Sequence, residues 1–244
     1  MQLPMPKPLA ALRFIVAYAS FVRDPAQLDR VFALLDGIDA QSSDGHGPLA
    51  HFLARPDVAA VMAEPRDPLT VDIADLRRLP ADTLGRAFSR FVDERGLDIS
   101  ELYRPGRDTE QPFDRLRLHL ERSHDLWHVV TGFATDTDGE LGLQAFYLAQ
   151  IEAPLAAAIL SAGLLNGLLY APQGLGRRME IMSFGWEYGR QARSLMGADW
   201  AALLREPLEV VRTRFGIDET MVSRAAAFEP AANIDARSDA RIAA

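Results

Sequence analysis

The sequence predicts an all-α protein, a single-domain helical bundle with a metal site on a helix-loop-helix hairpin. Apolar residues recur every three or four positions along most of the chain, which is the period of a helix face. The apolar segments are rich in alanine and leucine, which favour helices, and no sustained segment alternates β-branched and aromatic residues as a strand does. The helical period covers residues 9–22, 26–35, 115–133, 140–153, 177–196 and 200–215.

The composition of the chain and the positions of its helix-breaking residues indicate one domain. The chain has 244 residues, 48% hydrophobic and 25% charged, which is ordinary for a globular protein. Glycine, proline and polar residues interrupt the helical pattern at 37–48, 64–68, 103–112 and 135–139, where we expect interhelical loops. We therefore expect one domain over residues 1–244. The polar, alanine-rich tail at 218–244 has weak periodicity, which predicts partial disorder.

The N-terminal apolar run is predicted to be an amphipathic helix and not a secretion signal. Arg13 interrupts the run, and no small-residue cleavage site follows before Asp24. The first residues also lack the Arg-rich pattern of a mitochondrial transit peptide.

A second amphipathic helix is predicted within residues 76–95. A Pro-Ala-Asp start precedes Leu84, Phe88 and Phe91, which share one face of a helix. We interpret this segment as a core helix with a solvated charged side.

Residues 153–170 form the most apolar segment and approach the length needed to span a bilayer. Pro154 and Asn166 interrupt the segment, and Glu152 precedes it. These features favour a buried or membrane-touching helix over a spanning one.

Charge and cysteine content exclude several classes of function. The chain carries 34 acidic and 26 basic side chains, a net charge of -8, which disfavours binding to nucleic acids or attraction to anionic lipids. It has no cysteine, so any metal must be held by nitrogen and oxygen atoms.

The segment ERSHDLWHVVTGFATDTDGE, residues 121–140, carries the candidate chemistry. His124 and His128 are four residues apart, which places both imidazoles on one helix face. The segment TDTDG then turns the chain, and Glu140 begins a new helix from which it can point back at the histidines. Asp125 either completes the coordination or orients a ligand. Two neutral imidazoles and two carboxylates would balance a divalent charge.

This ligand set fits Zn²⁺, Mn²⁺, Fe²⁺ or Co²⁺ better than Ca²⁺ or Mg²⁺, because imidazole is a borderline ligand and hard cations prefer oxygen. The ligand types do not distinguish among these four ions. Two histidines at this spacing, taken alone, are more often a surface or core pair; the aspartate, the turn and the glutamate are what favour a metal site. The remaining histidines are not assigned, because His46 and His51 lie in or beside a polar loop and His119 faces away from His124.

With these residues in view, the chain resembles the coenzyme Q (ubiquinone) biosynthesis protein four family, whose signature is H-D-x-x-H followed after eleven residues by glutamate. HDLWH and Glu140 match every signature position, and similarity extends over about residues 8–217. The segment 76–98 and the turn residues Gly132 and Gly139 are also similar. Where the family pattern has lysine and glutamate, this chain has Gln144 and Tyr147.

The resemblance implies a cytoplasmic bacterial protein of ubiquinone biosynthesis. It implies metal-dependent oxidative decarboxylation of a polyprenylated 4-hydroxybenzoate-type ring, with the carboxylate replaced by hydroxyl. The catalytic residues would be His124, Asp125, His128 and Glu140, acting through the divalent metal ion. The prenyl tail would need an apolar groove. The helix at 153–170 either forms a wall of this groove or is an ordinary core helix.

Two alternatives remain open. One is a non-catalytic scaffold that binds the quinone precursor and organises other ubiquinone biosynthesis proteins. The other is the same chemistry on another prenylated aromatic acid, which the departures at Gln144 and Tyr147 keep open. We also expect a homodimer, and peripheral contact with the inner face of the membrane through apolar surface rather than basic residues.

Overall fold

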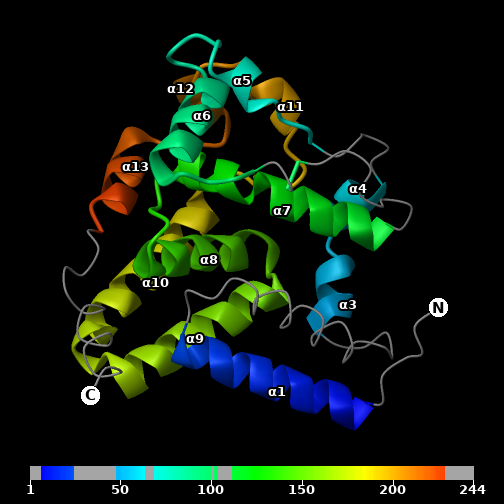
Figure 1. Cartoon of the computed structure of the whole chain (residues 1–244), viewed down its shortest axis with the longest axis vertical. Coiled ribbons are helices and arrows are strands. Elements are labelled where there is room, and N and C mark those ends of the chain that lie inside the picture. The colour runs from blue at the N-terminus through cyan, green and yellow to red at the C-terminus, as the bar shows by residue number, and fades with distance from the viewer. Residues whose placement is uncertain (1–6, 25–47, 64–68, 100–101, 104–111, 229–244) are drawn as a thin grey trace.

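The computed structural model describes residues 7–24, 48–63, 69–99, 102–103 and 112–228 (Figure 1). Over these residues the fold is all-α, as predicted, and the only β contact is an isolated bridge between Thr83 and Pro207. The helices are α1 (Lys7–Arg23), α3 (Pro48–Leu53), α4 (Pro56–Ala63), α5 (Ile73–Leu76), α6 (Leu84–Arg95), α7 (Pro112–Thr131), α8 (Thr137–Ile151), α9 (Pro154–Tyr170), the 3₁₀ helix η1 (Pro172–Gly174), α10 (Leu175–Gln191), α11 (Trp200–Leu203), α12 (Leu208–Arg214) and α13 (Glu219–Ala226).

Helix α8 lies in the middle of the molecule, between α7 on one side and α9 with α1 on the other (Figure 1). It packs most closely against α10, and glycines make this approach possible. A Cβ atom at Gly185 would lie 2.1 Å from the carbonyl oxygen of Gly142, and one at Gly189 would lie 2.7 Å from that of Phe146. Because side chains are absent at these points, the two backbones meet directly and α8 is held in place along its length.

The C-terminal end of α7 is held by side chains from distant parts of the chain. The guanidinium of Arg212 donates hydrogen bonds to the carbonyl oxygens of Val129 and Val130, at 3.1 and 3.0 Å. The hydroxyl of Tyr188 donates to the carbonyl oxygen of Thr131 at 3.1 Å. These bonds satisfy carbonyls that have no partner within the helix and fix the point at which the chain leaves α7.

Two predicted helices are longer in the sequence analysis than in the structure. The segment 200–215 is divided into α11 and α12, because Pro207 lacks an N–H and restricts the residue before it. The segment 177–196 ends at Gln191, where the amide nitrogen of Gln150 donates to the carbonyl oxygens of Gly189, Ala192 and Arg193. This side chain from α8 provides hydrogen bonds to the backbone carbonyl groups at the end of α10 and stabilises the turn that follows it.

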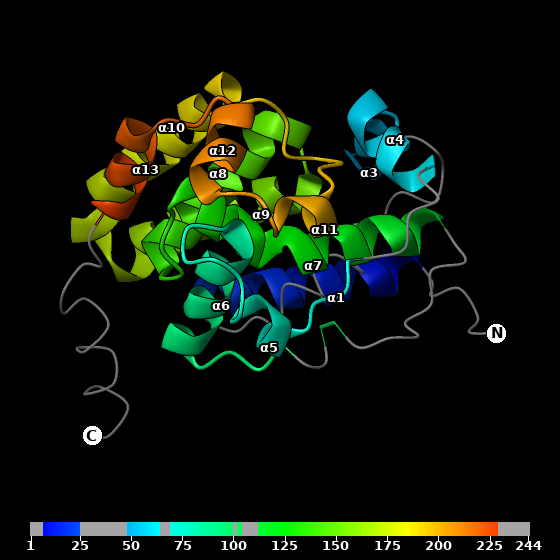
Figure 2. The same cartoon turned by 90° about the horizontal axis from the view of Figure 1, so that it is seen from above.

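Other boundaries agree more closely with the sequence. The predicted helix within 76–95 begins at Leu84, where the side chain of Thr83 accepts a hydrogen bond from the Arg86 N–H at 3.2 Å. The segment 26–35 lies outside the described residues. The tail at 218–244, for which weak periodicity predicted partial disorder, contains helix α13, because residues such as Val222 and Ala225 are buried on one of its faces. Helix α13 packs against α7 and, beside it in Figure 2, against α10.

Helices α1 and α9 lie side by side and form a second, smaller core with α8 (Figure 1). The Tyr18 hydroxyl donates to Ser161 at 2.9 Å, and the Asn166 amide donates to the carbonyl oxygen of Val22 at 2.7 Å. The inner face of α9, which includes Ala162 and Gly163, is therefore plain core. In the described part of the chain, no helix combines the length and the apolar character needed to cross a bilayer.

Candidate metal centre

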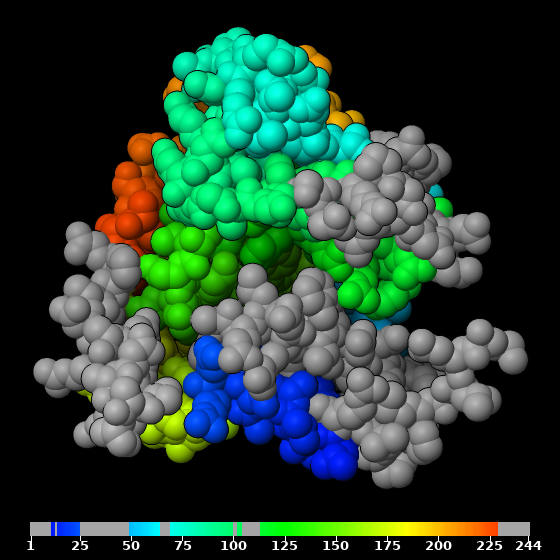
Figure 3. Space-filling view, in the orientation of Figure 1, coloured from blue at the N-terminus to red at the C-terminus, as the bar shows by residue number. Residues whose placement is uncertain are grey.

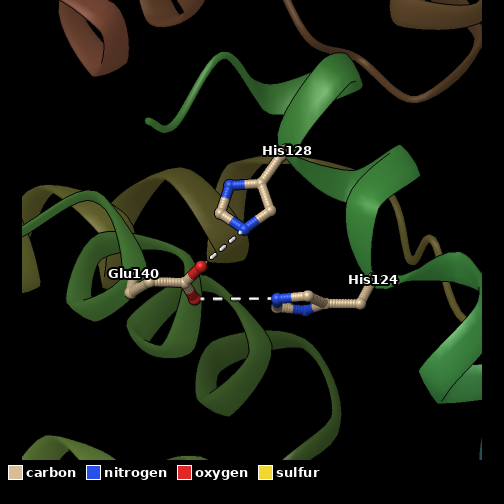
Figure 4. Close-up of side chains that lie close together, drawn as sticks. All are labelled: His124, His128 and Glu140. Carbon is tan, nitrogen blue, oxygen red and sulfur yellow. Dashed lines mark ion pairs between the residues drawn. The ribbon is translucent and has the colours of Figure 1, made fainter. Parts of the chain in front are cut away.

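The structure brings His124, His128 and Glu140 together (Figure 4). The two imidazoles extend from successive turns of α7, with ring centroids 4.9 Å apart and planes at 85°. The carboxylate of Glu140, in the first turn of α8, faces both rings: one oxygen lies 3.0 Å from His128 Nε2 and the other 3.6 Å from His124 Nε2. One ligand atom from each residue lies within 4.8 Å of the others, so a single ion can reach all three.

The turn between α7 and α8 aims Glu140 at the histidines. Gly132 has a φ of +84°, a left-handed conformation that side chains disfavour, and its N–H donates to the carbonyl oxygen of His128 at 2.8 Å. The chain then reverses, and the Asp136 carboxylate caps α8 by accepting from the Gly139 N–H at 2.7 Å. A Cβ atom at Gly139 would lie 2.2 Å from the carbonyl oxygen of Ala134, so this turn closes only with glycine there.

The hydrogen bonding of His128 leaves one ring nitrogen as a bare acceptor. Its Nδ1 lies 3.0 Å from the carbonyl oxygen of Phe133, and because a carbonyl only accepts, Nδ1 carries the proton. In the neutral ring Nε2 then offers a lone pair, and this atom is buried without a well-formed hydrogen bond. It faces a Glu140 oxygen, which is also an acceptor. Two acceptors at this distance repel unless a proton or a metal ion lies between them, and the residues present fit a divalent ion.

The electrostatics of the three groups are strongly coupled. Burial alone would raise the pKa of Glu140, but its close approach to the imidazoles of His124 and His128, and their positive charges when protonated, outweigh burial and hold this pKa far below its usual range. Burial alone would lower the pKa of His124, but the hydrogen bond to Glu140 and the charges of Glu140 and Asp125 raise it. Glu140 is therefore a carboxylate at neutral pH, as a metal ligand must be.

Access to the site is from one side. The side chain of His128 is fully buried, whereas His124 and Glu140 each keep 32% of their side-chain surface exposed. The ring of His128 also stacks on Phe91 of α6, with centroids 6.0 Å apart. The site thus has a closed inner wall and an open outer side, on which a ligand can approach.

The structure does not place Asp125 in the group formed by His124, His128 and Glu140. Asp125 follows His124 on α7 and is half-buried, and its charge acts on the pKa of His124 and of the buried Tyr103 and Tyr147. Its assignment as a fourth ligand remains a prediction.

Aromatic residues that the sequence analysis did not assign to the site line its buried side. Tyr147, seven residues after Glu140 on the same face of α8, stacks flat on Trp127, with centroids 4.0 Å apart and planes at 5°. The Tyr147 ring also lies 6.0 Å from that of His124. Burial, then the charges of Glu140 and Asp125, raises the pKa of Tyr147 well above 10. The seven-residue spacing from Glu140 was the feature of the sequence that could have placed Tyr147 near the site. Its stacking on Trp127 depends on how α7 and α8 pack and could not be predicted.

The other histidines are not part of this group. His51 pairs with Glu152 at 2.9 Å on the surface, beside Arg55, which donates to the same carboxylate at 2.7 Å. His119 lies half-buried on α7, away from the three clustered residues. His46 lies outside the described residues.

Comparisons with known proteins agree on one family. A sequence model of the family described as "Coenzyme Q (ubiquinone) biosynthesis protein Coq4" matches residues 64–221. The ubiquinone biosynthesis protein COQ4, mitochondrial, of Eremothecium gossypii is 30% identical over 148 residues, which are 60% of this chain and 45% of that protein. The COQ4 homolog, mitochondrial, of Bos taurus is 29% identical over 175 residues, 67% of this chain and 62% of that protein. The chain therefore spans about half the length of the curated relatives it matches.

A solved structure shares the fold. It is the crystal structure of a protein from Nostoc punctiforme PCC 73102 that is assigned to ubiquinone biosynthesis. The two chains are 29% identical and superpose with a TM-score of 0.70, covering 85% of this chain and 98% of that one.

The geometry predicts that the protein purified without chelator carries close to one divalent metal ion per chain. His124→Ala and Glu140→Gln each remove a ligand, so both should lower metal affinity by at least about tenfold and reduce the metal content measured by plasma mass spectrometry. His51→Ala, which removes a surface histidine outside the group, should retain the metal. Equal metal content in all four proteins, with helicity confirmed by circular dichroism, would exclude this site.

Proposed function

The chain belongs to the coenzyme Q (ubiquinone) biosynthesis protein Coq4 family, and on that premise we propose that it catalyses a metal-dependent oxidative decarboxylation in ubiquinone biosynthesis. Family membership confirms the resemblance inferred from HDLWH and Glu140. In the proposed reaction, the carboxylate of a polyprenylated 4-hydroxybenzoate-type ring is replaced by hydroxyl. The observation that carries the proposal is the buried lone pair of His128 Nε2 facing the Glu140 carboxylate, an arrangement that calls for a cation.

The proposed reaction removes two electrons from the substrate and releases carbon dioxide, so it requires an oxidant such as dioxygen as cosubstrate. His124, His128 and Glu140 would hold the ion, with Asp125 as a further candidate. When bound, a divalent ion would supply positive charge to a carboxylate or phenolate oxygen of the substrate, and a redox-active ion could also engage dioxygen.

The chain's own residues contribute orientation and access. The hydrogen bond from His128 Nδ1 to Phe133 fixes the imidazole so that Nε2 points at the site. The buried aromatic residues behind it exclude water, while the exposed edges of His124 and Glu140 leave a side for substrate.

The scaffold alternative is less well supported by this geometry. Structural zinc sites usually close around the ion with four protein ligands, whereas catalytic sites keep an open position. The described group has three ligands and an open side, which favours an enzyme.

The proposal predicts turnover by the isolated protein. A prenylated 4-hydroxybenzoate labelled at the carboxyl carbon, supplied with dioxygen and the metal-loaded protein, should release labelled carbon dioxide and yield a hydroxylated ring. Glu140→Gln should reduce this release by about a hundredfold or more, because the ion is lost with its ligand. Labelled product detected by mass spectrometry from the metal-free protein at the full rate would contradict the proposal. Binding of the precursor without any turnover would support the scaffold instead.

We also propose peripheral contact with the membrane, from which a prenylated substrate would be taken. This proposal rests on the outer surface of α1 and α9. In the space-filling view, α1 lies at the edge of the molecule (Figure 3). Ile15 and Val16 on α1 are 60% and 57% exposed, and Leu168 and Leu169 on α9 are 60% and 57% exposed. Exposed leucine and isoleucine on neighbouring helices favour insertion into the headgroup region without basic residues.

Vesicle flotation tests this contact. The protein should float with neutral phosphatidylcholine vesicles, and high salt should not release it, because the attraction is apolar. The double variant Leu168→Ser and Leu169→Ser should lose most of the binding, while Val210→Ser, which changes an exposed apolar residue on α12, should bind normally. Failure of the wild-type protein to float at any lipid composition would remove the proposal.

A further inference from the structure

Tyr147 carries a buried hydroxyl that lacks a hydrogen-bond partner among the described residues. The side chain is only 6% exposed, and the hydroxyl oxygen itself is inaccessible to water. Buried polar groups almost always have a partner, so an exception calls for an explanation.

The other buried tyrosines show what the fold usually provides. The Tyr103 hydroxyl donates to the carbonyl oxygen of Arg122 at 2.6 Å, and the Tyr188 hydroxyl donates to that of Thr131 at 3.1 Å. Both are held by backbone carbonyls. Tyr147 is the one fully packed tyrosine in the described part of the chain whose hydroxyl is left unpaired.

The ring of Tyr147 lies beside the metal centre. It contacts two residues of α7: it stacks flat on Trp127, with centroids 4.0 Å apart, and lies 6.0 Å from the ring of His124, with planes at 28°. It also shares a face of α8 with Glu140, two helical turns away. These contacts hold the ring beside the metal centre, and the hydroxyl has no hydrogen-bond partner among the described residues.

We propose that the Tyr147 hydroxyl donates a hydrogen bond to an oxygen of the aromatic acid that binds at the metal centre. This inference rests on the proposed function. An aromatic acid beside His124 presents carboxylate and phenol oxygens, which are acceptors, and a neutral phenol is a donor that adds no negative charge beside Glu140. Tyr147 is thus a positioning residue: the unpaired hydroxyl becomes paired when substrate binds, and ligands without an acceptor there are disfavoured.

The test compares ligand affinity with protein stability. The full-length protein loaded with Co²⁺ is titrated with 4-hydroxybenzoate, a soluble probe without the prenyl tail, by calorimetry and visible absorption. Tyr147→Phe removes only the hydroxyl, and it should raise the Kd about tenfold, the effect of one lost hydrogen bond, while the Co²⁺ content stays unchanged. The melting temperature of this variant should stay the same or rise, because an unpaired buried group has been removed.

Tyr103→Phe is the matched control. It removes a buried tyrosine hydroxyl that already has a partner, so the melting temperature should fall and the Kd should stay unchanged. An unchanged Kd in Tyr147→Phe, with normal binding by the wild-type protein, would overturn the role of Tyr147 and leave the proposed function intact. No binding of 4-hydroxybenzoate to the wild-type Co²⁺ protein would overturn recognition of the ring by Tyr147, whereas the turnover assay with the prenylated substrate decides the proposed function.

Discussion

The pairing of His128 with Glu140 is the constraint around which the rest of the structure is arranged. With its Nδ1 proton donated to Phe133, the imidazole directs a buried lone pair at a carboxylate that is ionised at neutral pH. This arrangement is unfavourable by itself, and a protein keeps such a pair close only where the surrounding fold holds it. A divalent ion would convert the same arrangement into a favourable one.

The fold supplies that support on both sides of the pair. Arg212 and Tyr188 fix the C-terminal end of α7, and Gly132 turns the chain directly after it. On the other side, α8 is held by its close backbone contact with α10 through Gly185. Helices distant in sequence therefore set the separation between the imidazole and the carboxylate, which a loop alone could not keep constant.

The local part of this arrangement was predictable from sequence. The four-residue spacing of His124 and His128 fixes their shared face, because it depends only on the helical period. The turn and the position of Glu140 follow from polar and glycine residues in one short segment, and the all-α class follows from apolar periodicity. The division at Pro207 was also visible in the sequence, although the apolar pattern continues through it.

The remaining features depend on contacts between distant segments. The end of α10 is determined by Gln150 from α8, and the stacking of Tyr147 on Trp127 requires that α7 and α8 be packed first. Periodicity carries no information on such contacts. Asp125 is a further example. The sequence shows that it follows His124 on the helix, but the distance between its carboxylate and a bound ion depends on how the helices pack.

X-ray absorption spectroscopy at the K-edge of the bound metal reports the atoms around the ion itself, so it shows whether His124 and His128 bind the metal. For the full-length wild-type protein, we expect nitrogen and oxygen ligands at about 2.0–2.2 Å, with outer-shell scattering equal to two imidazoles. In His124→Ala, reloaded with metal, this scattering should fall to that of one imidazole. A wild-type spectrum with oxygen ligands alone, or an imidazole signal that is unchanged in the variant, would contradict metal binding by these histidines.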